Sequence, residues 1–234
     1  MTAATIGFVL PFDSALDREY WRFLPESVDL YLARTPHVSG PLGVDLIAAV
    51  SDPDRVLPVA RDMAEALDPD IVVYACTSGS FLRGLEACSR LRADMEAAGC
   101  RQAGSTSEFL LDALTHLEAR TVAVATPYDD EMTGLLVKFL GEAGHDTVSV
   151  ANLGMTGDPK TVGPEAVLDL ALAADSDDAD VLFLSCTNLR TFEHIARLEA
   201  DLGKPVVAAN QVSVWGALRR IGAPMPRNDQ ALFA

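Results

Sequence analysis

Short apolar stretches alternate with longer amphipathic stretches along the whole chain. The apolar stretches lack strict alternation of apolar and polar residues, as expected for strands of a parallel sheet that helices cover on both faces. They lie at residues 5–10, 28–34, 70–75, 101–104, 120–125, 147–153, 180–185 and 205–209. This alternation of strands and helices predicts an α/β fold.

The stretches between the strands carry apolar residues at helical spacing. One helix is predicted to begin at Asp52-Pro53, where a capping residue precedes a proline at the first helical position. Further helices are predicted at 79–98, 107–117, 130–143, 164–174, 189–202 and 211–221. Residues 154–163 are rich in turn formers and predict a mobile loop, and the tail after Gly222 is predicted to be a surface extension.

The chain contains an internal repeat. Residues 7–13 (GFVLPFD) resemble residues 123–129 (AVATPYD), and two further pairs of similar strand ends follow in the same order. We therefore predict two pseudo-symmetric lobes, each a roughly four-stranded parallel sheet flanked by helices. The first lobe is predicted to comprise residues 1–112 plus 210–234, because the last helix is expected to pack back on it. The second lobe is predicted to comprise residues 113–209.

Two strands deliver a cysteine to their carboxyl ends, in matching positions of the two halves. Cys76 follows the strand at 70–75, and Cys186 follows the strand at 180–185. Ligands bind beyond the carboxyl ends of parallel strands, so we predict an active site in the cleft between the lobes, with both thiols facing it. A thiol before a helix N-terminus has a lowered pKa, which favours a thiolate that takes a proton from carbon or adds to an alkene. The alternative is that both cysteines are small buried hydrophobic residues.

Hydrogen-bonding side chains accompany these cysteines and other strand ends. They are Thr77, Ser78, Thr187 and Asn188 after the cysteines, and Ser14, Tyr128 and Asn210 at other strand ends. At helix N-termini such groups bind carboxylates and stabilise enolate-like charge, or they simply cap the helix. The tyrosine hydroxyl is suited to donate to an oxyanion, with an aromatic core position as the alternative.

Other reactive residues lack this context. Cys88 and Cys100 are predicted to be structural, and Arg83 and Arg190 to be solvated or to pair with neighbouring helices. The four histidines are scattered, so a cysteine-dependent amide hydrolase has no local support. No His/Cys spacing suits zinc, and no phosphate-binding motif stands out, so we predict neither a metal nor a cofactor.

The charge and composition narrow the partners further. The net charge of −16 argues against nucleic acid and against an anionic membrane surface. No apolar run approaches the roughly 20 residues of a membrane span, and four cysteines in 234 residues do not form a disulfide framework. The first residues lack the charged region of a signal peptide. We therefore expect a cytoplasmic protein with free thiols, whose partner is a small carboxylate.

The motifs together resemble the aspartate/glutamate racemase superfamily, in particular its branch with maleate cis–trans isomerase and arylmalonate decarboxylase. The resemblance covers most of the chain and rests on Leu10-Pro11 and on residues 76–84 (CTSGSFLRG), 126–128 (TPY), 185–189 (SCTNL) and 204–207 (KPVV). It implies two lobes with the site between them, no cofactor, and a homo-oligomer, either a dimer or a higher assembly.

The resemblance also implies roles for individual residues. Cys76 and Cys186 would act as paired acid and base, or as nucleophile and acid, while Thr77, Ser78 and Tyr128 would build a pocket for the developing enediolate. The resemblance also implies a difference, because the decarboxylase of this branch has a glycine in the position of Cys76 and keeps only the second cysteine. Two thiols fit an isomerase or racemase better, because one thiol protonates from one face only.

The main prediction is a cofactor-independent two-cysteine isomerase or racemase of a small carboxylate, with a dicarboxylate as first choice. Three alternatives stay open. The first is an arylmalonate-type decarboxylase that uses Cys186 as its proton donor, and the second is an ectoine-utilisation member of the same branch. The third is a non-catalytic protein that binds a small carboxylate.

Overall fold

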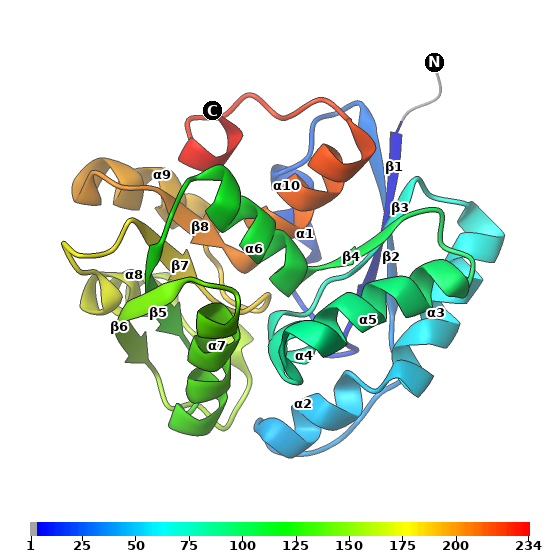
Figure 1. The fold of residues 1–234 in the computed structure, drawn as a ribbon, viewed down its shortest axis with the longest axis horizontal. Coiled ribbons are helices and arrows are strands. Elements are labelled where there is room, and N and C mark those ends of the chain that lie inside the picture. The colour runs from blue at the N-terminus through cyan, green and yellow to red at the C-terminus, as the bar shows by residue number, and fades with distance from the viewer. Residues whose placement is uncertain (1–3) are drawn as a thin grey trace.

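Two parallel four-stranded sheets with the same strand order form the framework of the computed structural model, which describes residues 4–234 (Figure 1). The first sheet has the order β2-β1-β3-β4 and the second the order β6-β5-β7-β8. The strands are β1 (Ala4–Leu10), β2 (Val28–Arg34), β3 (Ile71–Tyr74), β4 (Ala103–Ser105), β5 (Thr121–Thr126), β6 (Asp146–Asn152), β7 (Val181–Leu184) and β8 (Val206–Ala208). The predicted α/β class with two four-stranded parallel sheets is confirmed, and the matching strand orders agree with the internal repeat.

The two sheets also use the same device to set the register of their central strands. Asp70 stands just before β3, and its carboxylate accepts a hydrogen bond from the backbone N–H of Thr5 at 2.9 Å. Asp180 stands just before β7, and its carboxylate accepts from the backbone N–H of Thr121, also at 2.9 Å. Strands β3 and β7 are buried throughout their length, as their continuous apolar sequences predict.

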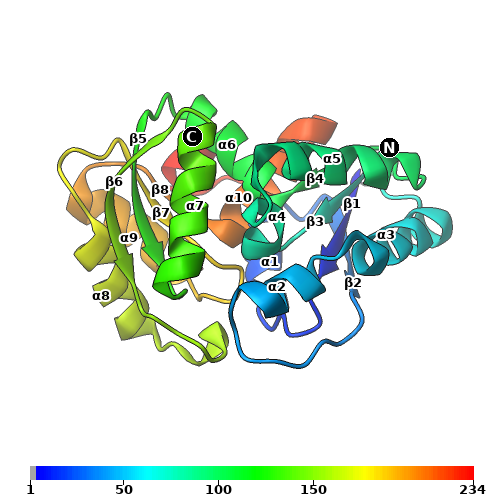
Figure 2. The same ribbon diagram turned by 60° about the horizontal axis from the view of Figure 1, so that its bottom comes forward.

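Ten α-helices of the described residues surround the sheets (Figure 2). They are α1 (Asp17–Arg22), α2 (Val44–Val50), α3 (Pro53–Leu67), α4 (Thr77–Phe81), α5 (Gly84–Ala97), α6 (Thr106–His116), α7 (Asp130–Glu142), α8 (Pro164–Ala174), α9 (Phe192–Leu202) and α10 (Ala209–Ile221). Short 3-10 turns occur at Pro159–Thr161 and Ala231–Phe233. None of the helices in residues 4–234 combines the length and the apolar character that crossing a membrane requires.

Several helices differ from the sequence prediction. The helix predicted at 79–98 is two helices, α4 and α5, because Gly84 adopts a φ of +80°, which a continuous helix does not allow. The helix predicted at 189–202 begins only at Phe192. Helices α1 and α2 lie in segments whose sequence predicts no helix, and neither has a side-chain N-cap that would mark its start.

The end of the C-terminal tail packs against the protein, so the prediction of a surface extension was wrong for residues 230–233, while residues 222–229 are exposed or half-buried. Leu232 is buried, and the ring of Phe233 stacks on that of Phe23 with 6.3 Å between centroids. The side chain of Gln211 donates a hydrogen bond to Gln230 at 2.9 Å. The apolar residues at the end of the tail pack against the protein, although the prolines and charged residues of the tail do not predict such packing.

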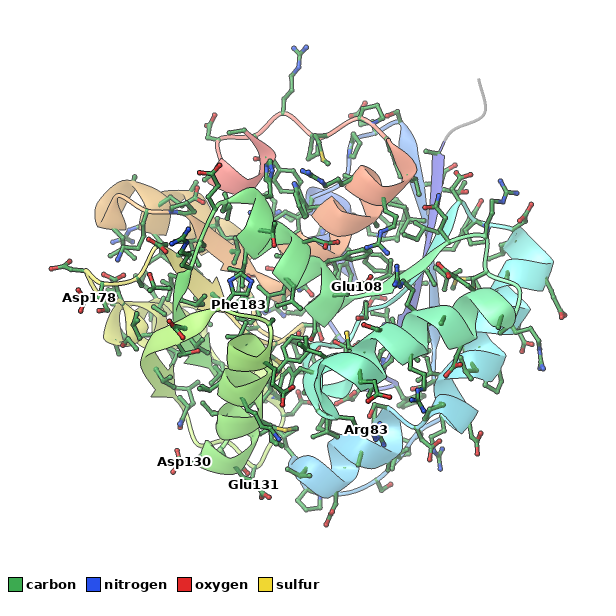
Figure 3. The ribbon with its side chains drawn as sticks, viewed as in Figure 1. Arg83, Glu108, Asp130, Glu131, Asp178 and Phe183 are labelled. Carbon is green, nitrogen blue, oxygen red and sulfur yellow. The ribbon has the colours of Figure 1, made fainter. Side chains whose placement is uncertain are left out.

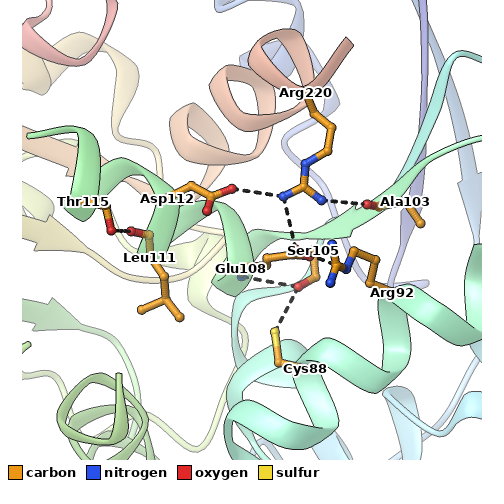
Figure 4. Close-up of polar contacts among 9 residues, drawn as sticks. All are labelled: Cys88, Arg92, Ala103, Ser105, Glu108, Leu111, Asp112, Thr115 and Arg220. Atoms are coloured by element: carbon orange, nitrogen blue, oxygen red, sulfur yellow. Dashed lines mark hydrogen bonds and ion pairs between the residues drawn. The ribbon is translucent and has the colours of Figure 1, made fainter. Parts of the chain in front are cut away.

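Helix α10 returns across the molecule and packs against α6 and β3 (Figure 1). The guanidinium of Arg220 donates to the carbonyl of Ala103 at 3.2 Å and pairs with Glu108 and Asp112, each at 3.1 Å (Figure 4). In the same region Cys88 lies 3.3 Å from the hydroxyl of Ser105, inside the protein. This surrounding agrees with the structural role that the sequence predicts for Cys88.

Candidate functional site

A small cavity of about 40 Å³ lies at the carboxyl ends of strands from both sheets, and both candidate cysteines line it. Seven of the nine residues that the sequence singles out contribute to its wall, namely Ser14, Cys76, Ser78, Tyr128, Cys186, Thr187 and Asn188. Thr77 and Asn210 do not line it. In residues 4–234, no three side chains of the metal-binding types gather into a cluster.

Cys76 joins the end of β3 to the start of α4. Its backbone is extended, and its Sγ accepts a hydrogen bond from the N–H of Gly79 at 3.3 Å and lies 3.9 Å from the hydroxyl of Ser78. Burial raises the pKa of the Cys76 thiol, and the Gly79 N–H and the hydroxyls of Tyr74 and Ser78 offset only part of that effect. The expectation of a lowered pKa was therefore wrong, because desolvation outweighs the helix N-terminus.

Cys186 follows β7 in a strained conformation, with a φ of +112° that residues other than glycine rarely adopt. Its Sγ accepts from the N–H of Asn188 at 3.4 Å. The prediction that Cys186 leads into a helix N-terminus was wrong, because α9 begins six residues later at Phe192. Burial raises the pKa of the Cys186 thiol to about 12, so the thiol is protonated at neutral pH.

Buried hydroxyls fix the turn that carries Cys76. The hydroxyl of Ser80 donates to the carbonyl of Cys76 at 2.6 Å and lies 2.7 Å from the hydroxyl of Ser107. The hydroxyl of Ser107 in turn donates to the carbonyl of Thr77 at 3.0 Å. The carbonyl of Thr77 is thus fixed by Ser107, whereas the Thr77 hydroxyl is buried, has no hydrogen-bond partner within residues 4–234 and does not line the cavity.

Tyr128 places a buried donor at the cavity. Its hydroxyl makes no hydrogen bond within residues 4–234, although the side chain is almost fully buried. Burial raises the pKa of Tyr128 well above its usual value, so the hydroxyl keeps its proton. A buried donor without a partner beside Cys186 is suited to receive a ligand oxyanion.

The two asparagines hold the loops of the site together. The side chain of Asn188 accepts from the N–H of Ala15 at 3.0 Å and donates to the carbonyl of Asp13 at 3.3 Å, which ties the Cys186 loop to the loop after β1. Asn210 donates to the carbonyl of Thr187 at 3.1 Å, behind the cavity. The side-chain amide of Asn188 is therefore engaged by protein groups, and Asn210 supports the loop from outside the cavity.

Glu19 is a functional candidate that the sequence analysis missed. Its buried carboxylate accepts from the backbone N–H groups of Thr191 and Phe192, at 2.6 and 2.7 Å, and from the side chain of Asn210 at 2.5 Å. Burial raises its pKa, and these donors partly offset the rise. Its partners lie between 172 and 191 residues away along the chain, so no local pattern identifies it.

An apolar group of residues completes the cavity. Leu42 precedes α2, Leu46, Ile47 and Val50 belong to it, and Pro159 comes from the loop at 154–163. The spacing of the three α2 residues places them on one face of that helix, which is the only signal in the sequence for this wall. Neither lysine nor arginine is among the described residues that line the cavity.

Comparison with known proteins finds similarity along nearly the whole chain. A family model described as arylmalonate decarboxylase matches residues 44–233. The arylmalonate decarboxylase of Bordetella bronchiseptica is 29% identical over 225 residues, which cover 93% of this chain and 90% of the relative. The maleate isomerase of Nocardia farcinica is 28% identical over 166 residues, which cover 67% of this chain and 66% of the relative.

Solved structures agree with this similarity. A liganded arylmalonate decarboxylase, in which one glycine is replaced by cysteine and one cysteine by serine, superposes with a TM-score of 0.89. Its sequence is 28% identical, and the match covers 98% of both chains. A mutant maleate isomerase from Pseudomonas putida S16 with maleate has a TM-score of 0.83 at 20% identity, covering 94% of this chain and 93% of that one, which supports the fold.

Proposed function

The chain belongs to the arylmalonate decarboxylase and maleate isomerase family of the aspartate/glutamate racemase superfamily, and we propose that it is a cofactor-independent decarboxylase of malonates with an apolar α-substituent. One observation carries the proposal: one cavity combines the protonated thiol of Cys186 with the unpartnered hydroxyl of Tyr128 and an apolar wall. The similarity to the decarboxylase also covers more of the chain than the similarity to the isomerase. The alternative from the sequence analysis is therefore preferred to its main prediction.

The lining of the cavity favours this substrate class over a dicarboxylate such as maleate. A dicarboxylate without an apolar substituent would place one of its two charged groups against the leucines and the proline of the wall. Among residues 4–234, neither a lysine nor an arginine lines the cavity to compensate that charge. An aryl or alkyl substituent gains free energy from the same surroundings. The departing carboxylate of a malonate loses its charge as carbon dioxide, so an apolar surrounding promotes its loss.

The proposed reaction needs only side chains of this chain. The bond between the α-carbon and one carboxylate breaks, carbon dioxide leaves, and the electron pair passes into the remaining carboxylate to form an enediolate. The hydroxyls of Ser78 and Tyr128 donate to its oxygens, while Ser14 and Thr187 hold the retained group. The Cys186 thiol then gives its proton to the α-carbon, and the thiolate recovers a proton from water.

The test follows 2-methyl-2-phenylmalonate, maleate and a 2-arylpropionate by proton NMR in deuterated water. We expect the malonate to release carbon dioxide and to give a product with deuterium at the α-carbon. Cys186→Ala should lower this rate by about 10³-fold, whereas Cys76→Gly should retain it. Conversion of maleate to fumarate with no turnover of the malonate would replace this proposal with the isomerase. Binding without turnover of any compound would favour the non-catalytic carboxylate-binding protein.

A second candidate function is racemisation of an α-substituted carboxylate, and the presence of Cys76 in the same cavity favours it. One thiolate would remove the α-proton, and the other thiol would return a proton to the opposite face. A single enantiomer of the 2-arylpropionate would then lose its α-proton signal and its optical activity, and either single-cysteine variant would abolish both changes. If the α-proton persists in the wild-type protein, this second function is excluded.

A further inference from the structure

Tyr74 carries a buried hydroxyl that the proposed reaction does not use. It is the last residue of β3, it is fully buried, and its Oη makes no hydrogen bond within residues 4–234. Buried hydroxyls nearly always have a partner, since leaving one unpaired costs free energy. The hydroxyl of Tyr74 is therefore an exception among buried hydroxyls.

The hydroxyl shares a small space with the sulfur of Cys76. A Cβ atom built on Gly79 would lie 2.6 Å from the Oη of Tyr74 and 3.0 Å from the Sγ of Cys76, so both atoms converge where Gly79 has no side chain. The N–H of Gly79 already donates to this sulfur. The hydroxyl thus approaches the thiol from the interior of the first half of the chain, whereas Ser78 lines the cavity.

We propose that Tyr74 donates a hydrogen bond to the thiolate form of Cys76 and so makes Cys76 the proton acceptor of the site. This inference rests on the second candidate function, racemisation, in which one thiolate removes the α-proton. The hydroxyl has no partner while the thiol is neutral, and ionisation of the sulfur supplies one, with the greater strength of a charge-assisted bond. Burial raises the pKa of Tyr74 well above 10, so the phenol stays protonated and remains a donor.

The internal repeat offers a comparison within the same molecule. Residue 184, two positions before Cys186, corresponds to Tyr74 and is a leucine, which has no donor. Cys186 instead has the hydroxyl of Tyr128 beside it. A tyrosine hydroxyl therefore lies beside each thiol, Tyr74 beside Cys76 and Tyr128 beside Cys186. Tyr128 lines the cavity and is available to a ligand, whereas Tyr74 does not line it. This asymmetry divides the roles, with Cys76 as acceptor and Cys186 as donor.

Two other charged groups near Cys76 and Tyr74 have opposite effects on ionisation. Asp13, in the loop after β1, disfavours a charge on either cysteine and on Tyr74. Arg83 favours a charge on Tyr74 and is anchored by the carbonyl and hydroxyl of Ser51, at 3.3 and 3.1 Å. Figure 3 shows Arg83 beside α2, where its guanidinium also donates to the carbonyl of Ala48 at 3.0 Å. Neither Asp13 nor Arg83 replaces a direct hydrogen bond from the hydroxyl of Tyr74 to the sulfur of Cys76.

The test measures the reactivity of each cysteine separately in the full-length protein. Iodoacetamide labelling between pH 6 and 10, followed by peptide mass spectrometry, gives one rate profile for Cys76 and one for Cys186. Tyr74→Phe should shift the Cys76 profile to higher pH and slow its labelling at pH 8 about 10-fold, and leave the Cys186 profile unchanged. Tyr128→Phe is the matched control and should affect Cys186 instead. An unchanged Cys76 profile in Tyr74→Phe would overturn the proposal.

Two further readouts separate this role from a structural one. A hydroxyl without a partner in the resting protein contributes nothing to folding, so Tyr74→Phe should keep or raise the melting temperature. If the variant instead loses its fold, the phenol is structural and the proposal fails. Tyr74→Phe should also slow α-proton exchange about 10-fold relative to the wild-type protein. If no substrate exchanges its α-proton, the racemisation is excluded, but the labelling profiles still decide the role of Tyr74.

Discussion

At the scale of single residues, two cysteines in equivalent positions of the repeat have different surroundings. Cys76 has an extended backbone with donors from Gly79 and Ser78, whereas Cys186 has a positive φ and one backbone donor. Burial raises the pKa of both thiols. The resting site therefore holds two neutral thiols, and a charge appears only when a ligand or a proton transfer creates it.

The protonation state of Cys186 can be measured directly. In a variant with Cys76→Ser, Cys88→Ser and Cys100→Ser, the thiolate absorbance near 240 nm reports Cys186 alone. Because the pKa of Cys186 is raised to about 12, we expect less than about a tenth of the thiol to ionise at pH 10. The same variant with Cys186→Ser subtracts the tyrosine signal. A midpoint below pH 9 in the folded protein would contradict the prediction.

The raised pKa of Cys186 also affects the free energy of unfolding, and the variant with the other three cysteines replaced by serine tests this effect as well. The folded protein holds the Cys186 proton more firmly than the unfolded chain does. The free energy of unfolding should therefore fall as the pH rises above about 9, where the thiol of the unfolded chain ionises first. Urea titrations at pH 8 and pH 10 measure this change. The decrease should be smaller when Cys186 is also replaced by serine.

At the scale of elements, the short helix α1 anchors the loop that carries Cys186. Glu19 of α1 accepts the first N–H groups of α9 and the side chain of Asn210, which in turn holds the carbonyl of Thr187. A single carboxylate thus connects α1, α9, α10 and the loop that carries Cys186. Its removal leaves several buried donors without partners.

Glu19→Ala should lower the free energy of unfolding by about 3 kcal/mol, because two backbone N–H groups and one side-chain amide lose their acceptor. Asp17→Ala is the control within the same helix. Asp17 pairs with the partly exposed Arg34, so its loss should cost less than about 1 kcal/mol. Urea denaturation of both variants measures the difference. Equal effects would show that Glu19 does not anchor the loop.

The contact between α10 and α6 depends on small residues. A Cβ atom on Gly216 of α10 would lie 2.1 Å from the ring of Phe109, so Gly216→Ala should destabilise the protein by about 1–3 kcal/mol despite its higher helix propensity. Gly134→Ala in α7 is the control, since nothing lies within 4 Å of its Cβ position. That change should raise the stability by about 0.5–1 kcal/mol. Thermal unfolding compares the two variants, and a stabilising Gly216→Ala would refute this account of the packing.

At the scale of the whole molecule, a strongly acidic protein is proposed to bind an anion. The net charge is −16, and acidic residues such as Asp130, Glu131 and Asp178 lie at the periphery, whereas Phe183 lies in the interior (Figure 3). The cavity offers hydroxyl and thiol donors but no lysine or arginine among its described lining residues. Recognition of the anion therefore depends on short-range hydrogen bonds, against an unfavourable long-range field.

This arrangement predicts an unusual response to salt. Screening weakens the repulsion between protein and substrate, so kcat/KM for the malonate should rise about 2- to 5-fold between 0.01 M and 0.15 M ionic strength. Initial rates at a substrate concentration below KM measure the effect. A decrease with salt would mean that local basic residues, such as Arg18 and Arg190 at the surface, guide the substrate instead.

The sequence predicts most of the fold because the strands have continuous apolar patterns and the repeat doubles the signal. It also predicts seven residues of the cavity wall, since the carboxyl ends of parallel strands meet at one edge. It does not predict Glu19, whose partners are distant in the chain, or α1 and α2, which lack side-chain caps. The pKa of each cysteine depends on burial in the assembled structure, so the local helix N-terminus gave the wrong direction for both thiols.

The packing of α10 on α6 sets the order in which the protein becomes complete during synthesis. Helix α6 leaves the ribosome long before α10, and at about 5–20 residues per second the delay is roughly 5–20 seconds. Throughout that interval the surface around Phe109 that Gly216 later covers is exposed. During that interval the nascent first half lacks the helix that covers Phe109 in the folded protein. A circular permutant that places α10 ahead of β1 would remove this delay, because α10 would then be synthesised before α6.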